Sequence, residues 1–416
     1  MQKLFGGSSF AKNVFTLASG TAVAQAIPLA VSPLLTRLYT PEEFGIFSVY
    51  FGLLMIASVF ATGKFELAIV LPSDQEEAKT ILDLSILVAM ATSSVLFLSL
   101  LATGNFVLEA FHAQEMGWNL LWLPLGILGV GTSQGFYYYL NRQKKFRGMA
   151  LMRIVRSIAY AALALAGANV GWLAGLIMAD ALSYLLSAII AARQARFQPM
   201  RFSGWPSLKQ AGAKFANFPK YLLLSGILEK GAGQAPVFFL TNLLSALSSA
   251  GFFSFAQRMI VAPADLVSRA IGDVFRQQAS EEYARKGECK EVFRKTMLKL
   301  LAIGIFPFCL AYFVVEDAFS LVFGAEWRTA GNYARIMMPM FFLQFVVSPL
   351  SVMFVIAGKQ KYDLFMQVFL LGSVVLSFSL GYRFGVEIES IFIAFTFVYM
   401  IKYLVELGLS AKFSGL

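Results

Sequence analysis

Charged residues are scarce in this sequence: Asp, Glu, Lys and Arg make up 14% of its 416 residues, whereas hydrophobic residues make up 58%. A soluble chain carries about 25% charged residues. There are one histidine and two cysteines, which excludes a metal site built from Cys and His. Cys289 falls in a basic loop and Cys309 in an apolar run, so we expect no disulfide. No phosphate-binding G-x-x-x-x-G-K-S/T loop occurs, so we predict neither a cofactor nor an ATP motor.

Long apolar runs dominate instead and recur from Val14 to Leu409. A bilayer core about 30 Å thick is crossed by roughly 20 apolar residues in a helix that rises 1.5 Å per residue. Runs of this length predict an all-α integral membrane protein with twelve transmembrane helices. The predicted spans are 13–38, 42–71, 80–102, 118–140, 150–168, 170–192, 219–243, 249–273, 297–316, 333–356, 363–382 and 388–410.

Basic residues concentrate in alternate loops, after the second, fourth, sixth, eighth and tenth predicted spans. Because Lys and Arg are enriched in cytoplasmic loops, both termini are predicted to be cytoplasmic. The net charge of +10 is then chiefly an orientation signal. Nucleic-acid binding is not expected, since the basic loops would lie against an anionic leaflet. The loops on the other side are short, which leaves little room for an acceptor-binding domain.

The chain also divides into two similar halves. Ser19-Gly20 aligns with Ser225-Gly226, and the same shift aligns Gly45–Ser48 with Gly251–Ser254. An even number of spans in each half keeps the halves parallel, with a central cavity between them as the substrate path. We therefore predict an N-terminal six-helix lobe over 1–192, a basic cytoplasmic linker over 193–218 and a C-terminal six-helix lobe over 219–416.

The first and seventh predicted spans both contain residues that disrupt helices. Pro28 and Pro33 interrupt the first, and Gly231, Gly233 and Pro236 interrupt the seventh. Proline removes a backbone hydrogen bond and kinks a helix. Paired interruptions at corresponding positions predict a moving gate. The alternative is that Pro and Gly are simply common in membrane helices.

Local patterns predict two further features of the helices. Thr40–Glu43 predicts an N-cap with a capping box, and the apolar run that follows continues to Leu71. A span of that length must tilt, bend or protrude. Gly167, Gly171 and Gly175 recur at i,i+4, which favours close helix packing over a ligand role.

Charged residues inside the predicted spans need partners or a water-filled cavity, because an unpaired charge is costly in the bilayer. They gather in the second, seventh and eighth spans, with a few in the fifth and sixth, and a central cavity would explain this. The predicted cationic substrate-binding residues are Arg258, Lys230, Lys64, Arg269, Arg153 and Arg37, and those predicted for ion coupling or charge balance are Glu66, Glu229, Asp265 and Asp180.

The two deepest cations have a functional and a structural interpretation. Arg258 lies about 13 Å along its helix from the outer end, too deep to extend out of the membrane. It either meets an anionic substrate group or pairs with an acid on a neighbouring helix. Lys230 is similarly deep, and Glu229 is expected to point elsewhere, because i,i+1 residues do not face each other on a helix.

Three other cations lie nearer the predicted inner face. Lys64, Arg153 and Arg269 are as well explained by snorkelling to the membrane surface as by substrate binding. Asp265, Arg269 and Asp273 recur at i,i+4 and predict an acid–base–acid ladder along one helix face. Such a ladder is either structural or functional.

Two short segments resemble a known family. Leu35–Gly45, with the sequence LTRLYTPEEFG, is similar to the connection between the first two helices of bacterial polysaccharide flippases. Phe65–Pro72, followed by Glu76-Glu77-Ala78, resembles the stretch that leads to their third helix. These are the Wzx-type O-antigen flippases of the multidrug/oligosaccharidyl-lipid/polysaccharide exporter superfamily. Length, span count and the two-lobe pattern agree over the whole chain.

The resemblance implies a transporter of the bacterial cytoplasmic (inner) membrane that is not an enzyme. Its expected function is to flip an undecaprenyl-pyrophosphate-linked oligosaccharide, an O-antigen or related repeat unit of lipopolysaccharide biosynthesis, from the cytoplasmic to the periplasmic leaflet. The expected mechanism is alternating access coupled to an ion gradient. The expected partners are this lipid-linked oligosaccharide, membrane lipids, a polysaccharide polymerase and a chain-length regulator. Arg and Lys in a low-dielectric cavity would attract the anionic pyrophosphate.

Other functions compete with this one. A multidrug-type small-molecule exporter shares the two-lobe design but usually favours an acidic cavity for cationic compounds, whereas several candidates here are bases. A membrane polysaccharide polymerase or ligase needs larger outer loops and an outward-facing catalytic cluster. A peptidoglycan-precursor flippase carries helices beyond the twelve predicted here.

Overall fold

The computed structural model describes residues 7–169, 175–197 and 203–416, and every regular element within these ranges is a helix. The predicted all-α membrane fold is therefore confirmed. The helices form two compact units, Met1–Lys230 and Gly231–Leu416, each with its own core. We refer to them as the N-terminal unit and the C-terminal unit.

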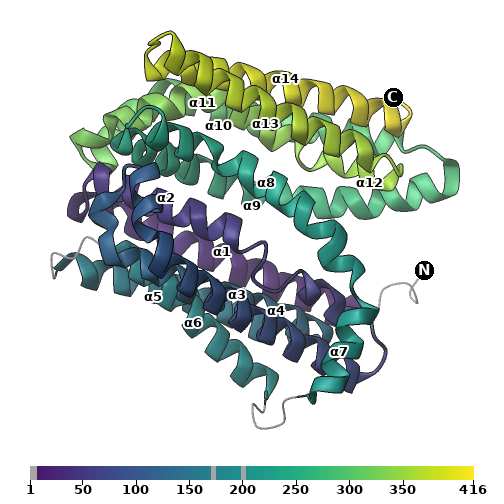
Figure 1. Ribbon diagram of the computed structural model, residues 1–416. Coiled ribbons are helices and arrows are strands. Elements are labelled where there is room, and N and C mark those ends of the chain that lie inside the picture. Colours follow the sequence, from purple (N-terminus) through teal and green to yellow (C-terminus); the bar gives the residue numbers. More distant parts are fainter. Residues whose placement is uncertain (1–6, 170–174, 198–202) are drawn as a thin grey trace. The chain divides into compact units, whose positions relative to one another are not determined.

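In the N-terminal unit, α5 packs against both α1 and α6, while α4 packs against α3 and α6 (Figure 1). Buried apolar side chains such as Leu82, Phe136 and Met149 form the core between these helices. The elements are α1 (Gly7–Leu38), α2 (Pro41–Ala57), η1 (Phe65–Val70), α3 (Gln75–Ala110), η2 (Gln114–Leu121), α4 (Trp122–Arg142), α5 (Phe146–Asn169), α6 (Gly175–Ala195), α7 (Trp205–Lys214) and α8 (Asn217–Asn242), whose C-terminal part belongs to the other unit.

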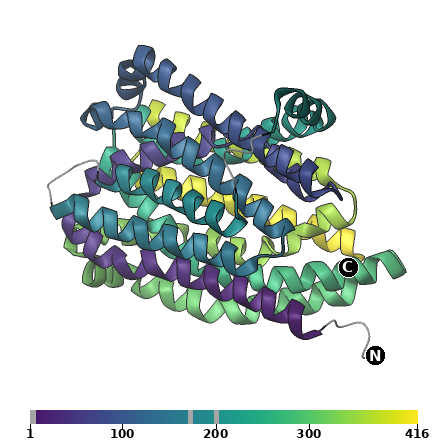
Figure 2. The ribbon, with the colours of Figure 1, turned by 90° about the horizontal axis from the view of Figure 1, so that it is seen from below.

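In the C-terminal unit, α11 packs against α9, α10 and α14, and α13 packs against α14. Figure 2 shows the helices from a second side, with this unit in green to yellow. Aromatic rings fill much of the interior, as where Phe253 of α9 stacks on Phe392 of α14 at a centroid distance of 5.4 Å. The elements are α9 (Leu247–Lys286), α10 (Lys290–Phe323), η4 (Ala325–Trp327), α11 (Arg328–Val347), η5 (Leu350–Val352), α12 (Met353–Ile356), α13 (Gln360–Arg383) and α14 (Ile388–Ser414).

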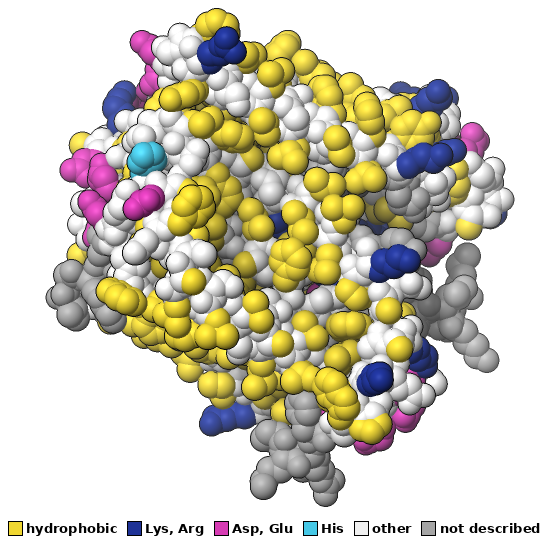
Figure 3. Space-filling model, viewed as in Figure 1, with side chains coloured by type: hydrophobic (Ala, Val, Ile, Leu, Met, Phe, Trp, Pro, Cys, Tyr) yellow, Lys and Arg dark blue, Asp and Glu magenta, His cyan; other side chains and the backbone are white. Residues whose placement is uncertain are grey.

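Hydrophobic side chains are spread over the face of the molecule that Figure 3 shows. On α3, Val95 and Leu98 are 64% and 65% exposed, and on α10 Phe306 and Phe313 are 72% and 78% exposed. Exposed apolar surface on this scale marks an interaction with a membrane or a partner rather than with water. The exposed faces of α3 and α10 therefore suit contact with lipid.

Seven of the described helices are long and apolar enough to cross a membrane, and the bent pair formed by α11 with η5 and α12 makes an eighth. The chain is thus a multi-pass membrane protein. The predicted spans other than 42–71 fall on helices where the structure describes them, but the number that cross the bilayer stays a prediction. The seven are α1, α3, α5, α6, α10, α13 and α14.

The prediction of one long span over 42–71 is wrong. Helix α2 begins with the predicted capping box between Thr40 and Glu43, but it ends at Ala57. Gly63 and Lys64 then both adopt left-handed backbone conformations, with φ of +60° and +65°. A right-handed helix cannot continue through two such residues. Glu66, in the short η1 helix that follows, therefore does not lie on α2.

The predicted linker over 193–218 contains a helix, α7, which packs on α3. Lys214 of α7 forms an ion pair with Glu77 of α3 at 2.5 Å. Just before α7, Ser203 donates to Asp83 of α3 from both its backbone nitrogen and its hydroxyl. The predicted lobe boundaries stay predictions, while the two compact units divide at Lys230 within α8.

The glycine repeat acts between two helices. Gly167 of α5 and Gly175 of α6 approach so closely that a Cβ added to Gly167 would lie 2.6 Å from the Cα atom of Gly175. The hydroxyl of Tyr39 occupies the remaining space and donates to the carbonyl of Ala164 at 2.7 Å. The third member, Gly171, lies outside the described residues.

Candidate functional site

The centre of the candidate site is α5, a predicted membrane-crossing helix with two arginines one turn apart. Arg153 and Arg156 are at i,i+3 and so lie on the same side of the helix. Helix α1 approaches this side closely, because Gly20 has no side chain where it meets Ala150 of α5. The absence of that side chain places the polar residues of α1 within reach of Arg153.

Arg153 is half-buried and contacts two other helices. Its Nη1 donates to the hydroxyl of Thr21 on α1 at 2.5 Å. Its guanidinium group lies 4.9 Å from the ring centroid of Tyr137 on α4, a cation–π contact. Both partners are neutral, so Arg153 keeps its positive charge uncompensated among the described residues.

Arg156 differs because it has an acidic partner. Its Nη2 lies 3.4 Å from Oδ1 of Asp180 on α6, and its guanidinium group lies 3.6 Å from the ring centroid of Tyr184. The Asp180 residue is 3% exposed. The buried hydroxyl of Tyr50 also interacts electrostatically with Asp180. Asp180, predicted for charge balance, therefore has an arginine to balance within its own unit.

Lys64, predicted for substrate binding, and Glu66, predicted for ion coupling or charge balance, make different contacts. Glu66 is buried and accepts a hydrogen bond from the hydroxyl of Thr62. Lys64 is half-buried and packs beside Gly226 of α8, where its Nζ would lie 3.5 Å from an added Cβ. Lys64 makes no ion pair with a described residue. It is therefore a second uncompensated cation of the N-terminal unit.

Glu229 and Lys230, in the seventh predicted span, are neighbours on α8. The expectation that Glu229 points away from Lys230 is wrong, because Nζ of Lys230 lies 3.2 Å from Oε1 of Glu229. Two long, exposed side chains can bend toward each other even at adjacent helical positions. Lys230 thus has an acidic neighbour.

Arg37, in the last turn of α1, is exposed, and its part in a cavity stays a prediction.

The candidates of the C-terminal unit lie along α9. Arg258 is half-buried in the middle of this helix. Arg269 donates to Asp265 at 2.7 Å, as the i,i+4 spacing predicts, and 73% of its side chain is exposed. Asp273 is exposed one turn further along. Because the units are separate bodies, a cavity that joins Arg258 to the cations of the N-terminal unit stays a prediction.

The sequence interpretation missed several partners. Tyr137 and Tyr184 hold the α5 arginines, and a run of three tyrosines at 137–139 was the available signal for the first. It also missed Lys402 and Glu406, which form a buried ion pair on α14 at 2.6 Å. Their i,i+4 spacing in the last predicted span was visible in the sequence.

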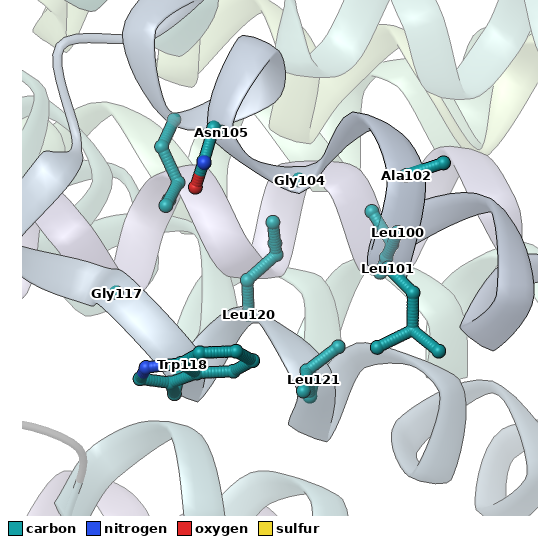
Figure 4. A pocket seen from close by; sticks show the side chains of 10 residues that line it. Leu100, Leu101, Ala102, Gly104, Asn105, Gly117, Trp118, Leu120 and Leu121 are labelled. Atoms are coloured by element: carbon teal, nitrogen blue, oxygen red, sulfur yellow. The ribbon is translucent and has the colours of Figure 1, made fainter.

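A separate pocket of about 260 Å³ lies between the end of α3 and η2 (Figure 4). Trp118, Leu120 and Leu121 line it from η2, and Asn105 is its one amide side chain. None of the residues that line it is charged, so it is unsuited to holding an anion. Among the described residues no group of three or more His, Cys, Asp or Glu side chains is placed to hold a metal ion.

Comparison of the sequence with known families gives a match to the family described as polysaccharide biosynthesis protein, over residues 34–332. The chain belongs to this family. The match extends through both compact units and includes the α5 arginines, Lys64 and the candidates of α9. No sequence match was found among curated proteins.

Solved structures similar to this member of the polysaccharide biosynthesis family include a flippase and several transporters. The lipid II flippase MurJ, in an inward closed conformation, has a TM-score of 0.75 at 13% identity, covering 95% of this chain and 87% of MurJ. A MOP-superfamily transporter from Pyrococcus furiosus has a TM-score of 0.60 at 13% identity, with 96% and 94% covered. An inward-facing multidrug resistance MATE transporter has a TM-score of 0.59 at 14% identity, with 96% and 94% covered. The chain therefore has the fold of the MOP superfamily.

Proposed function

We propose that this protein is a flippase that moves an undecaprenyl-pyrophosphate-linked oligosaccharide from the cytoplasmic to the periplasmic leaflet of a bacterial inner membrane. The oligosaccharide would be an O-antigen or related repeat unit, moved by alternating access between the two lobes and coupled to an ion gradient. Both termini would be cytoplasmic. The protein binds and reorients its substrate and makes no covalent change to it.

The observation that carries the proposal is the uncompensated charge of Arg153. This arginine lies on a helix that is long and apolar enough to cross a membrane, and its described partners, Thr21 and Tyr137, are neutral. Charges on membrane helices are costly and mark substrate or ion pathways. An arginine fork can hold phosphate oxygens through two parallel hydrogen bonds. A pyrophosphate head group fits this chemistry.

Lys64 supports the same substrate class. It is half-buried and makes no described ion pair, so the N-terminal unit has a second cation without an acidic partner that suits an anionic head group. The polyprenyl tail would stay in the lipid that covers the apolar helix faces. A cationic drug would be repelled by Arg153 and Lys64, which argues against the multidrug exporter. The fold of a known flippase supports transport over polymerase activity.

The test is genetic and biochemical. The gene is deleted in its host, and complete single repeat units on the cytoplasmic leaflet are measured together with surface polysaccharide. The flippase predicts that single units accumulate on the cytoplasmic leaflet and that the polymer is lost. If single units instead reach the outer leaflet and remain unjoined, a polymerase is the better explanation and the proposal is wrong.

Point variants then test the site. Arg153→Ala should fail to restore export, and Arg153→Lys should restore only part of it, because a lysine lacks the two-pronged guanidinium group. Arg294→Ala is the matched control, since Arg294 is an exposed arginine of α10. Equal export by Arg153→Ala and the control, at equal protein levels, would refute the assigned site.

A further inference from the structure

A column of buried polar side chains runs along one face of α14, and the proposed function leaves it unused. It passes through Thr396, Tyr403, Glu406, Ser410 and Ser414, each at most 6% exposed. Steps of three, four or seven residues keep these side chains on one helix face. Because α14 is a candidate membrane-crossing helix, this column places polar groups inside an apolar environment.

An ion pair lies within the column. Nζ of Lys402 is 2.6 Å from Oε2 of Glu406, and the two side chains are 8% and 5% exposed. The ammonium group also lies 4.4 Å from the ring centroid of Tyr403. Replacing a buried ion pair with apolar residues often leaves a protein equally stable or more stable. A contribution to stability is therefore a weak explanation for this ion pair. Ionisable residues buried in membrane helices commonly serve as ion or proton relays.

Hydroxyl groups lie on the same face of α14 on both sides of the ion pair. The buried Oγ of Ser410, one turn from Glu406, has no hydrogen-bond partner among the described residues, and neither has the buried Oγ1 of Thr396. A helical serine can instead bond back one turn, as Ser377 of α13 does. A buried polar group without a partner calls for an ordered water. One turn beyond Ser410 lies Ser414, at the end of α14.

The charged and titratable groups around the pair come from its own helix and from each element packed against α14. Tyr399 and Tyr403 lie on α14 itself, and Asp265 of α9 interacts electrostatically with Tyr403. The start of α11, with Arg328 and Arg335, lies beside the start of α14, where Asn332 bonds Glu389, far from Lys402. Helix α12 and η5 contain no titratable residue. The core shared with α14 adds Tyr283 and Cys289, and the end of α14 adds Lys412 and Glu288 beside Gly415. The other groups are the exposed Lys290, Glu291, Arg294, Lys295 and Lys299 in the first part of α10, Cys309, Tyr312, Glu316 and Asp317 in its second part, Tyr333 of α11, and Lys361, Tyr362, Tyr382 and Arg383 toward the two ends of α13.

We infer that the Lys402–Glu406 pair is a proton-exchange site that couples transport to a pH gradient, reached from the Ser414 end along Ser410 and bound water. The inference rests on the proposed function, for which it supplies the coupling ion. In the exchange step a hydronium ion gives one proton to the Glu406 carboxylate and leaves as water. The ion pair breaks, Lys402 keeps its proton, and the net charge of the pair rises from zero to plus one. Release of the proton restores the pair.

The test uses the full chain in liposomes with a fluorescent undecaprenyl-pyrophosphate-linked disaccharide. With one proton exchanged per lipid, a gradient of one pH unit shifts the equilibrium distribution between leaflets about tenfold. Lys402→Met combined with Glu406→Gln removes both charges at similar volume. This double variant should show no shift, while it still equilibrates the lipid between leaflets when no gradient is applied. A tenfold shift in the double variant would overturn the inference.

A second variant covers the case in which the double variant does not fold. Ser410→Ala should slow the approach to the shifted distribution several-fold, whereas Ser377→Ala, a serine-to-alanine change on α13, should leave it unchanged. Equal rates for the two would overturn the proton path. A wild-type chain that moves no lipid even without a gradient refutes the proposed function instead. In that case infrared spectra recorded at two pH values still decide, since the change in the carboxyl band with pH must be larger in the wild type than in Glu406→Gln. Equal changes would overturn the inference.

Discussion

Arg156 and Asp180 join α5 to α6 in the interior of the N-terminal unit, with Nη2 and Oδ1 3.4 Å apart. The carboxylate belongs to a residue that is only 3% exposed, and the guanidinium group also covers the ring of Tyr184. The pair therefore compensates the charge of Arg156, whereas Arg153, one turn earlier on α5, has no acidic partner among the described residues. This asymmetry gives the site its net positive charge.

The first prediction concerns this pair. Asp180→Asn removes the negative charge and leaves Arg156 without its counter-ion. We expect a loss of about 1–3 kcal/mol in the free energy of unfolding. This is less than for a fully buried pair, because 37% of the Arg156 side chain is exposed. The measurement is thermal unfolding in detergent, with Asp317→Asn as the control. Asp317 is an exposed partner of Arg328, so its replacement should cost at most about 1 kcal/mol.

The second prediction concerns the contact of α1 with α5. In Gly20→Ala the new methyl group would collide with Ala150, so α1 must move outward. We expect destabilisation of about 1–3 kcal/mol. Loss of the bond from Arg153 to Thr21 should reduce export beyond the effect of lower stability. The matched control is Gly372→Ala on α13, where no described atom lies within 4 Å of the added carbon. That change should be neutral or stabilising by up to about 1 kcal/mol.

The third prediction tests the capping box of α2. Thr40→Ala removes the oxygen that accepts from the backbone nitrogen of Glu43. The expected cost is about 1 kcal/mol. Thr103→Ala is the control, because this exposed threonine only bonds back to Ser99 within α3. An equal loss in the free energy of unfolding for both variants would show that the capping box makes no specific contribution to stability.

The helices could be predicted from the sequence because long apolar runs and end signals act locally. The capping box at Thr40 depends only on residues within one turn, and the structure has it. The end of α2 at Ala57 could not be predicted in the same way. The residues between Ser58 and Lys64 are mostly apolar, so the sequence predicts that the span continues through them. Only the left-handed backbone at Gly63 and Lys64 shows the break.

The site was less predictable, because its charges are paired by tertiary contacts. The sequence placed Arg153 and Asp180 in the membrane, but the partner of Asp180 is Arg156, and Arg153 is held by Thr21 and Tyr137. Helix periodicity did find the Asp265–Arg269 bond, since both residues lie on one helix. Contacts between helices depend on which faces meet, and a single sequence does not give that information.

The last prediction concerns Cys289, which lies in the turn before α10. Its thiol is fully buried, and Sγ lies 3.5 Å from Sδ of Met353. Burial raises the pKa of the Cys289 thiol to about 11, and the carboxylates of Glu282 and Glu288 add to the shift. In the folded protein at pH 8, a maleimide reagent should leave Cys289 unmodified. Unfolding in detergent at high temperature should make it reactive.

The same pKa shift makes stability depend on pH with a definite sign. The folded thiol holds its proton more tightly than the unfolded one, whose pKa is near 9. The stabilisation is therefore complete below pH 9 and is lost as the pH rises to about 11. A pKa shift of this size corresponds to a change of roughly 2–3 kcal/mol in the free energy of unfolding. Because other groups also titrate here, the measurement is a comparison of unfolding midpoints between pH 8.5 and 11 for the wild type and Cys289→Ala. The variant should lose less stability over this range, and equal losses would contradict the assigned pKa.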